Sequence, residues 1–193
     1  MESWRLHRIK RKIMKKLIII TLLLFSQLVV AQKYFTRTGT THFKASVEAF
    51  EPVEAINNSS TSILNVASGD IAVQLFISAF QFKVALMQEH FNENYMDSDT
   101  YPKTTFRGKL SNFSLENLQN QKEFPLQGTL TIRGIKKEIS TIAKVSFKKN
   151  IIKLSSNFSV EPQDFGIEIP SIVRKKIAEK INIKINYELA EKK

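Results

Sequence analysis

Histidine and acidic side chains are the first candidates for chemistry, because the chain has no cysteine and only three histidines. His7 lies in a basic N-terminal segment, which leaves His42 and His90. His90 and Glu93 are three residues apart, a spacing that places both on one face of a helix and supplies two metal ligands at most. Zinc in proteins takes about three or four protein ligands. A solvated polar helix face is therefore the simpler interpretation of this pair.

Other signatures of catalysis are not found in the sequence. There is no Gly-x-Ser-x-Gly motif, the six glycines are isolated from one another, and no pair of carboxylates stands out. Without cysteine, the chain has no disulfide, thiolate zinc site or cysteine nucleophile. We therefore predict no enzymatic activity, no metal site and no obligatory cofactor.

The positive signal is apolar. Thirteen of the fourteen phenylalanines follow residue 31, and three of them have even spacing that would direct them to one side of a strand. Each could be ordinary core, but methionines and flat rings together also suit an elongated apolar ligand. The residues predicted to line such a cavity are Phe76, Phe80, Phe82, Leu86, Met87, Phe91, Tyr95, Met96 and Phe106. Their polar neighbours Glu89, Asn92 and Glu93 are expected to face water.

The elements that must position these residues are mostly strands. Two short helical patterns interrupt them, at 86–96 and at 169–180, where Pro170 starts the second pattern. Alternation of apolar and polar residues predicts strands within 41–50, 61–84 (two strands around Ser68-Gly69-Asp70), 104–115, 123–160 (three strands, with turns at 133–134 and 148–150) and 181–189.

About eight strands at hairpin spacing, without a βαβ rhythm, indicate an all-β fold. An antiparallel barrel or sandwich with short helical insertions follows, as one domain over residues 32–193. A closed sheet of about eight strands is either filled by its side chains or holds one small ligand.

Residues 1–31 have the pattern of a cleavable signal peptide. A basic region precedes an apolar run of 14 residues, 17–30, and Val29 and Ala31 are small residues before the expected cleavage site. The run is shorter than the roughly 20 residues of a membrane span. An uncleaved anchor and a start at Met14 stay open as alternatives.

Removal of that segment changes the charge of the protein. The formal charge of +11 includes seven basic residues and one acidic residue within 1–31, which leaves 22 basic and 17 acidic residues, or +5, in the mature chain. A nucleic-acid partner is therefore not predicted. The basic residues Arg174, Lys175, Lys176, Lys180 and Lys184 are either a contact for anionic lipid head groups or, the interpretation we favour, the solvent face of a helix.

Three blocks of sequence resemble the YceI-like family, in that family's order. They are "FQFKVALMQEHFNENYMDSDTYPKTTFRGKL" (80–110), "QGTLTIRGIKKEI" (127–139) and "DFGIEIPSIV" (164–173), and the resemblance covers roughly residues 34–189. One departure is Arg133, where many relatives have histidine, so no role of that histidine carries over.

The resemblance implies an exported, periplasmic bacterial protein that folds as an eight-stranded antiparallel lipocalin-like barrel. It implies a polyisoprenoid lipid, such as an isoprenoid quinone, held along an apolar tunnel through the barrel, with transient contact with a membrane surface and no typical catalytic activity. A homodimer is possible. Two alternatives stay open: a secreted barrel with a solid interior that binds a protein partner, and a lipid hydrolase or isomerase with a polar cluster around His42 or His90.

Overall fold

The computed structural model describes Met14, residues 32–47 and residues 52–192. The chain divides into two units, Met1–Ala31 and Gln32–Lys193, and all that follows concerns the second. The predicted signal peptide, apart from Met14, lies outside the described residues. Among the helices that are described, none has the length and apolar character needed to cross a membrane.

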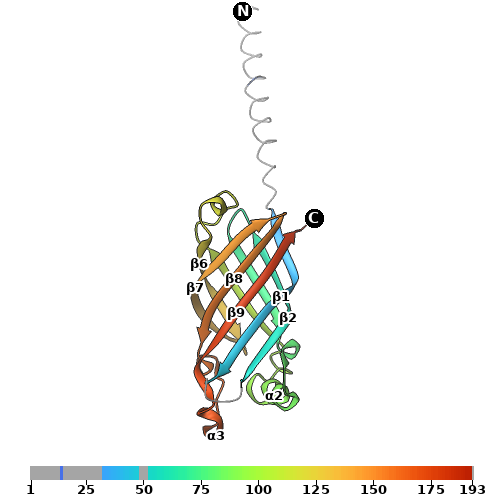
Figure 1. Ribbon diagram of the computed structural model, residues 1–193, viewed down its shortest axis with the longest axis vertical. Coiled ribbons are helices and arrows are strands. Elements are labelled where there is room, and N and C mark those ends of the chain that lie inside the picture. The colour runs from blue at the N-terminus through green and yellow to red at the C-terminus, as the bar shows by residue number, and fades with distance from the viewer. Residues whose placement is uncertain (1–13, 15–31, 48–51, 193) are drawn as a thin grey trace, which may run out of the picture. The chain divides into compact units, whose positions relative to one another are not determined.

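The second unit is a closed antiparallel barrel (Figure 1). Eight strands form the wall in the order β1-β9-β8-β7-β6-β5-β3-β2, and pairing of β1 with β2 closes it. Their bounds are β1 Lys33–Ser46, β2 Glu54–Asn65, β3 Asp70–Phe76, β5 Lys103–Leu110, β6 Glu123–Ile132, β7 Ile135–Lys148, β8 Ile151–Val160 and β9 Ile177–Glu191. The two-residue strand β4, Gln81–Phe82, pairs with the start of β2. The predicted eight-stranded barrel is confirmed.

Tight turns make the neighbouring strands antiparallel. The β6–β7 turn has Arg133 and Gly134 at φ 48° and 75°, and the β7–β8 turn has Lys149 and Asn150 at φ 52° and 60°. Two successive positive φ angles match the twist of a hairpin, and Gly and Asn adopt them readily. Gly69, at φ 75°, turns β2 into β3. The turns predicted from these residues are confirmed.

Short helical segments occupy the connections. At one end lie η1 (Ile77–Ala79), α2 (Ala85–His90), a π-helical turn η2 (Phe91–Tyr95), η4 (Pro162–Phe165) and α3 (Ser171–Arg174). At the other end, η3 (Asn117–Gln119) belongs to a loop whose Leu115 and Leu118 pack on the barrel core. The helical segment predicted within 86–96 is confirmed.

The helix predicted over 169–180 is wrong for most of its length. Only Ser171–Arg174 is helical, and β9 begins at Ile177. Ile177 pairs with Ser46 of β1, and Ile181 pairs with Val160 of β8. Partners on both sides therefore hold this stretch in the sheet, because strand pairing outweighs a local helical spacing of apolar residues.

The two halves of the barrel interior differ. The half where β1 begins and β9 ends is a solid core, with Tyr34, Leu64, Phe124 and Leu189 all at 0% exposure. The half near α2 and α3 has a second cluster, which includes Phe43, Phe80, Met96 and Phe165. That second cluster surrounds a cavity.

Candidate functional site

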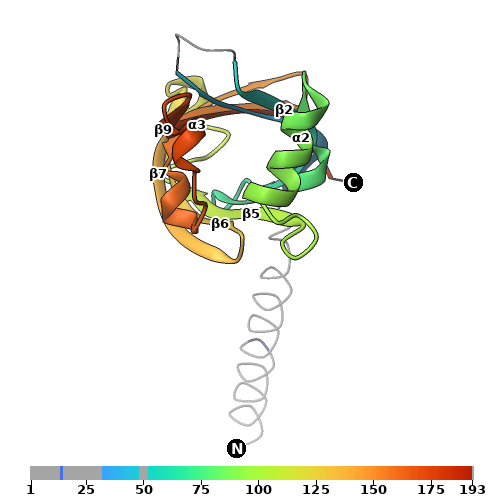
Figure 2. The same cartoon turned by 90° about the horizontal axis from the view of Figure 1, so that it is seen from below.

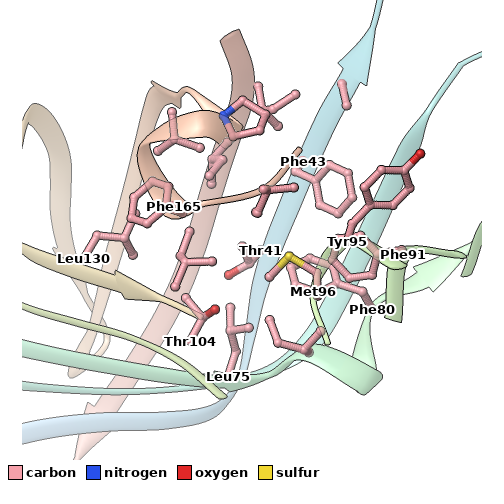
Figure 3. A pocket seen from close by; sticks show the side chains of 18 of the residues that line it. Thr41, Phe43, Leu75, Phe80, Phe91, Tyr95, Met96, Thr104, Leu130 and Phe165 are labelled. Carbon is pink, nitrogen blue, oxygen red and sulfur yellow. The ribbon is translucent and has the colours of Figure 1, made fainter. Parts of the chain in front are cut away.

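An apolar cavity of about 420 Å³ occupies the half of the barrel near α2 and α3 (Figure 3). Its volume lies in the range of small-molecule sites, about 300–1,000 Å³. His90 and Lys176 line it and are exposed, so the cavity opens to solvent at this end, the mouth. Seen along the barrel, α2 and α3 lie on opposite sides of that end (Figure 2).

Four phenylalanine rings form one wall. The Phe91 ring centroid lies 5.3 Å from that of Phe43, 5.6 Å from Phe80 and 5.1 Å from Phe82, and the Phe43 and Phe91 rings are stacked. Phe43 comes from β1, Phe82 from β4 and Phe91 from η2, so contacts between rings hold the helical segment against the barrel. Each such pair contributes about 0.5–1.5 kcal/mol beyond the area it buries.

The opposite wall is mostly aliphatic and comes from the later strands. Inward positions of β6 to β9 and of the segment that joins β8 to β9 supply Leu130, Ile132, Ile139, Phe158, Val160, Phe165, Ile167, Ile169, Ile177, Ile181 and Ile183. Branched side chains at alternate positions of a strand present a smooth apolar surface. Such a surface offers mainly dispersion contacts to a hydrocarbon chain, although Thr141 of β7 also adds a hydroxyl group to the lining.

Hydroxyl groups mark the inner end of the cavity. Thr41 Oγ1 lies 2.9 Å from Ser60 Oγ and 3.1 Å from Tyr187 Oη, and all three side chains are buried. Burial raises the pKa of Tyr187 to about 12, although the hydrogen bonds with Thr41 and Ser60 act in the other direction. A Cβ on Gly39 would lie 2.5 Å from the Tyr187 ring, so glycine makes room for that ring.

The cavity is closed at these hydroxyl groups, which corrects the expectation of a tunnel through the barrel. The solid core fills the barrel from Tyr187 to the far end, with Tyr34 and Phe124 among its fully buried rings. The site is therefore a blind apolar pocket that ends within the barrel and opens at the end near α2 and α3. A long chain would be only partly enclosed, because the filled half leaves it no exit.

Seven of the nine residues predicted to line the cavity do so: Phe80, Phe82, Met87, Phe91, Tyr95, Met96 and Phe106. The structure brings them together from β4, α2, η2, β5 and the adjoining loops. Whether they contact a ligand stays a prediction.

Phe76 and Leu86 do not line the cavity. β3 ends at Phe76 and the turn η1 follows, so Phe76, Phe80 and Phe82 do not share one strand as predicted. Phe76 is 46% exposed, with Lys103 Nζ 5.1 Å from its ring centroid. Leu86 is 57% exposed on α2. Among the polar residues predicted to face water, Glu89 and Glu93 are exposed, but Asn92 is half-buried.

Four further residues that line the cavity were not predicted: Phe43, Leu75, Leu130 and Phe165. The first three lie at inward positions of β1, β3 and β6, so strand alternation carried a signal for them. Phe165 ends η4 just before Gly166, whose φ is 63°. A loop residue of this kind has no periodicity by which to find it.

The polar residues first considered for chemistry are held apart. His42 points out of the barrel wall, where its Nε2 lies 3.3 Å from Glu54 Oε2. The pKa of Glu54 is lowered, chiefly by a hydrogen bond from Lys83 and secondarily by His42. His90 lies at the mouth, and within residues 32–47 and 52–192 no hydrogen bond or ion pair joins it to another side chain. The same residues hold no group of three acidic or histidine side chains placed to bind a metal.

Arg133 links the β6–β7 turn to a neighbouring loop at the mouth. Its guanidinium donates a 2.7 Å hydrogen bond to the carbonyl oxygen of Gly166 and lies 5.9 Å from the centroid of the Tyr101 ring. It joins the β6–β7 turn to the segment after η4 and does not line the cavity.

Solved structures with the same fold include three bacterial proteins. BcnA of Burkholderia cenocepacia is 14% identical, with a TM-score of 0.66 over 78% of this chain and 96% of its own. A polyisoprenoid binding domain from Saccharophagus degradans, implicated in plant cell wall breakdown, is 11% identical, with a TM-score of 0.70 over 83% and 98%. The YCEI protein of Campylobacter jejuni is 21% identical, with a TM-score of 0.59 over 75% and 87%. At these identities the likeness establishes a shared fold.

No curated protein matches the chain. The sequence model of the YceI-like domain matches residues 27–189. This range includes all of the barrel strands except the last two residues of β9. The three blocks that carry the resemblance, 80–110, 127–139 and 164–173, all fall within this match and surround the mouth half of the barrel. The chain therefore belongs to the YceI-like domain family.

Proposed function

We propose that this protein is an exported carrier that holds the hydrocarbon chain of a polyisoprenoid lipid, such as an isoprenoid quinone, in the blind cavity. The observation that carries the proposal is an apolar cavity of about 420 Å³ that is walled by phenylalanine, isoleucine and leucine and has exposed residues at its mouth. The solved relative described as a polyisoprenoid binding domain supports the class of ligand. A polar head group would stay near His90 and Lys176 at the mouth.

The size of the hydrophobic effect decides how such a carrier works. Moving one five-carbon isoprene unit from water into the cavity gains about 3–4 kcal/mol, at about 0.8 kcal/mol per carbon. Association costs about 4–15 kcal/mol, so three to five buried units give roughly micromolar affinity from water. A polyprenyl lipid starts in a membrane, where its chain is already in an apolar environment. The protein should therefore exchange lipid with membranes and store it, and should not extract it strongly.

The proposal includes export to the periplasm. Residues 1–31 carry the signal-peptide pattern, so the mature protein would begin at Gln32, directly before β1. N-terminal sequencing of the protein recovered from the periplasm would give Gln32 as the first residue. Recovery of the whole chain in the membrane fraction would contradict cleavage.

The alternative of a barrel with a solid interior that binds only a protein partner has less support, because the mouth half is hollow. The hydrolase or isomerase alternative also has less support. His42 lies outside the barrel, and His90 has no polar side-chain partner among residues 32–47 and 52–192.

The test is transfer of a labelled polyprenyl quinone between donor and acceptor liposomes. The mature protein should speed the exchange. Phe91→Asp should abolish most of that effect, because it places a carboxylate in the wall of four phenylalanine rings. Glu93→Ala, an exposed position in the same π-helical turn, should leave transfer unchanged.

Folding of both variants is checked by circular dichroism, because Phe91 also contributes to packing. A folded wild type that neither binds the quinone nor speeds its exchange would overturn the proposal. Equal effects of the two variants would mean that the sides of the helical segment are wrongly assigned.

A further inference from the structure

Exposed apolar side chains gather at the mouth of the barrel. Large apolar residues with high exposure in the barrel unit are Val47, Ile56, Phe76, Val84, Leu86, Tyr101, Ile135, Ile142, Phe147 and Ile172. All of them except Ile142 and Phe147 lie at or near strand ends on the mouth side or in its helical segments. Soluble proteins expose single apolar residues everywhere, but a cluster at one end marks an interaction surface.

Helices α2 and α3 lie on opposite sides of the mouth (Figure 2), and their side chains are arranged alike. On α3, Val173 lines the cavity, while the preceding residue, Ile172, is 87% exposed. On α2, Met87 lines the cavity, while the preceding residue, Leu86, is 57% exposed. Each helix therefore gives one apolar side chain to the cavity and presents the adjacent one to the surroundings of the mouth.

Positive charge accompanies the apolar residues on the α3 side. Arg174, Lys175 and Lys176 come after Ile172 and Val173 in the sequence, and all three are exposed. Within residues 32–47 and 52–192, no ion pair engages any of the three, and the Arg174 guanidinium donates only to the carbonyl oxygen of Ile169. Glu89 and Glu93 are exposed on the α2 side, so we assign the electrostatic attraction to α3 alone.

We infer that the rim of the mouth is a bilayer-docking surface: Ile172 and Leu86 enter the interfacial layer of a membrane, and Arg174, Lys175 and Lys176 contact anionic head groups. Docking in this orientation places the mouth of the cavity directly against the acyl chains. The purpose of docking rests on the proposed function, but binding to vesicles is measured with no ligand added to the cavity. Two aliphatic side chains and three basic ones give weak, reversible attachment, which suits a carrier that must leave again.

The first test is flotation of the mature protein with vesicles of phosphatidylcholine, with and without phosphatidylglycerol. The wild type should bind the anionic vesicles more tightly, and salt should weaken that binding. The double variant Leu86→Ser/Ile172→Ser should lose at least about tenfold in vesicle affinity. The control Ile142→Ser changes an exposed apolar residue of β7 away from the mouth and should bind as the wild type does.

A second pair of variants tests the charge. Lys175→Gln should lower affinity for the anionic vesicles about fivefold and leave binding to neutral vesicles unchanged. Lys149→Gln changes an exposed lysine in the β7–β8 turn, at the opposite end of the barrel, and should have no effect. Equal losses of vesicle affinity in a mouth variant and its control would overturn the inference. Failure of the wild type to bind either kind of vesicle would also overturn it.

A lipid-free assay separates this inference from the proposed function. Ile172→Ser should bind a fluorescent nitrobenzoxadiazole derivative of geranylgeraniol in buffer as tightly as the wild type does, because Ile172 does not line the cavity. Loss of vesicle binding with intact probe binding supports docking at the rim. Intact vesicle binding in a wild type that binds no probe would contradict the proposed function and leave the docking surface standing.

Discussion

Tyr187 connects the filled and hollow halves of the barrel, because its ring belongs to the solid core while its hydroxyl meets Thr41 at the inner end of the cavity. Gly39 leaves space for the ring, and Thr41 joins the Tyr187 hydroxyl to Ser60. A polar group of this kind is tolerated in an apolar interior because it is hydrogen-bonded. In the proposed function, this residue would limit the depth to which a ligand enters.

The raised pKa of Tyr187 predicts a loss of stability in alkali. The tyrosine of the unfolded chain loses its proton near the ordinary pKa of 10.0, whereas the folded one keeps it to about pH 12. Its contribution to the free energy of unfolding is therefore complete below pH 10. This contribution is lost between pH 10 and 12, at up to about 1.4 kcal/mol per pH unit.

Urea unfolding between pH 10 and 12 measures how steeply the free energy of unfolding falls with pH, and Tyr187→Phe is the comparison. The variant should lose less stability between pH 10 and 12 than the wild type does. A smaller slope should persist in it, because the pKa of Tyr34 is also raised, first by burial and then by Glu191. Identical slopes in the two proteins would contradict the assignment to Tyr187.

Periodicity predicts the direction of individual side chains correctly within an unbroken element. Phe91 and Tyr95 are four residues apart in a helical pattern, and both face the cavity. Phe76 fails because an even spacing points to one face only within an unbroken strand, and β3 stops at that residue. Phe43 and Leu130 belong to strands that were correctly recognised, but alternation alone does not separate a cavity wall from a filled core.

Among the elements, β5 and β6 approach each other closely at a pair of glycines. Gly108 pairs with Gly128, and a Cβ on Gly128 would lie 2.2 Å from the carbonyl oxygen of Arg107 and 2.3 Å from Gly108 Cα. A Cβ on Gly108 would lie 2.5 Å from the ring of Phe106, which lines the cavity. The pair of glycines therefore lets two strands come together and leaves room for a wall residue.

Gly128→Ala should consequently lower the free energy of unfolding by about 3 kcal/mol, because backbone atoms of the neighbouring strand must move. The adjacent Thr129→Ala, which removes only an exposed hydrogen bond with Glu138, should cost about 1 kcal/mol or less. Denaturant titration of both variants measures the difference. Equal, small losses would show that the two strands adapt without strain.

The elements also show why the helix within 86–96 was predicted correctly and the helix over 169–180 was not. The 86–96 helix is bounded by a loop and an aspartate-rich turn, and its apolar spacing has no competing strand partner. In 169–180, Ile172, Val173 and Ile177 fit a helix, yet Ile177 also continues the alternation of Ile181 and Ile183. Pairing with β1 and β8 decides between the two patterns, and that information is non-local.

For the whole molecule, the fold was predictable and the shape of its interior was not. Strand count, turns and the absence of a βαβ pattern lead to a closed antiparallel sheet. The division into a solid half and a hollow half depends on how large side chains such as Tyr34, Phe124 and Tyr187 fill one end. Their packing depends on residues far apart in the chain. The sequence therefore led to the prediction of a tunnel, whereas the structure has a pocket.

Native mass spectrometry of the mature protein shows whether this hollow half of the barrel holds a hydrocarbon chain. Protein purified from its own host, or incubated with geranylgeraniol, should carry one bound lipid per barrel, and extraction should yield a molecule built of isoprene units. Leu130→Trp, which fills the cavity from β6, should stay folded and lose the adduct. A wild-type barrel that shows only the bare protein mass in both preparations would contradict the proposed function.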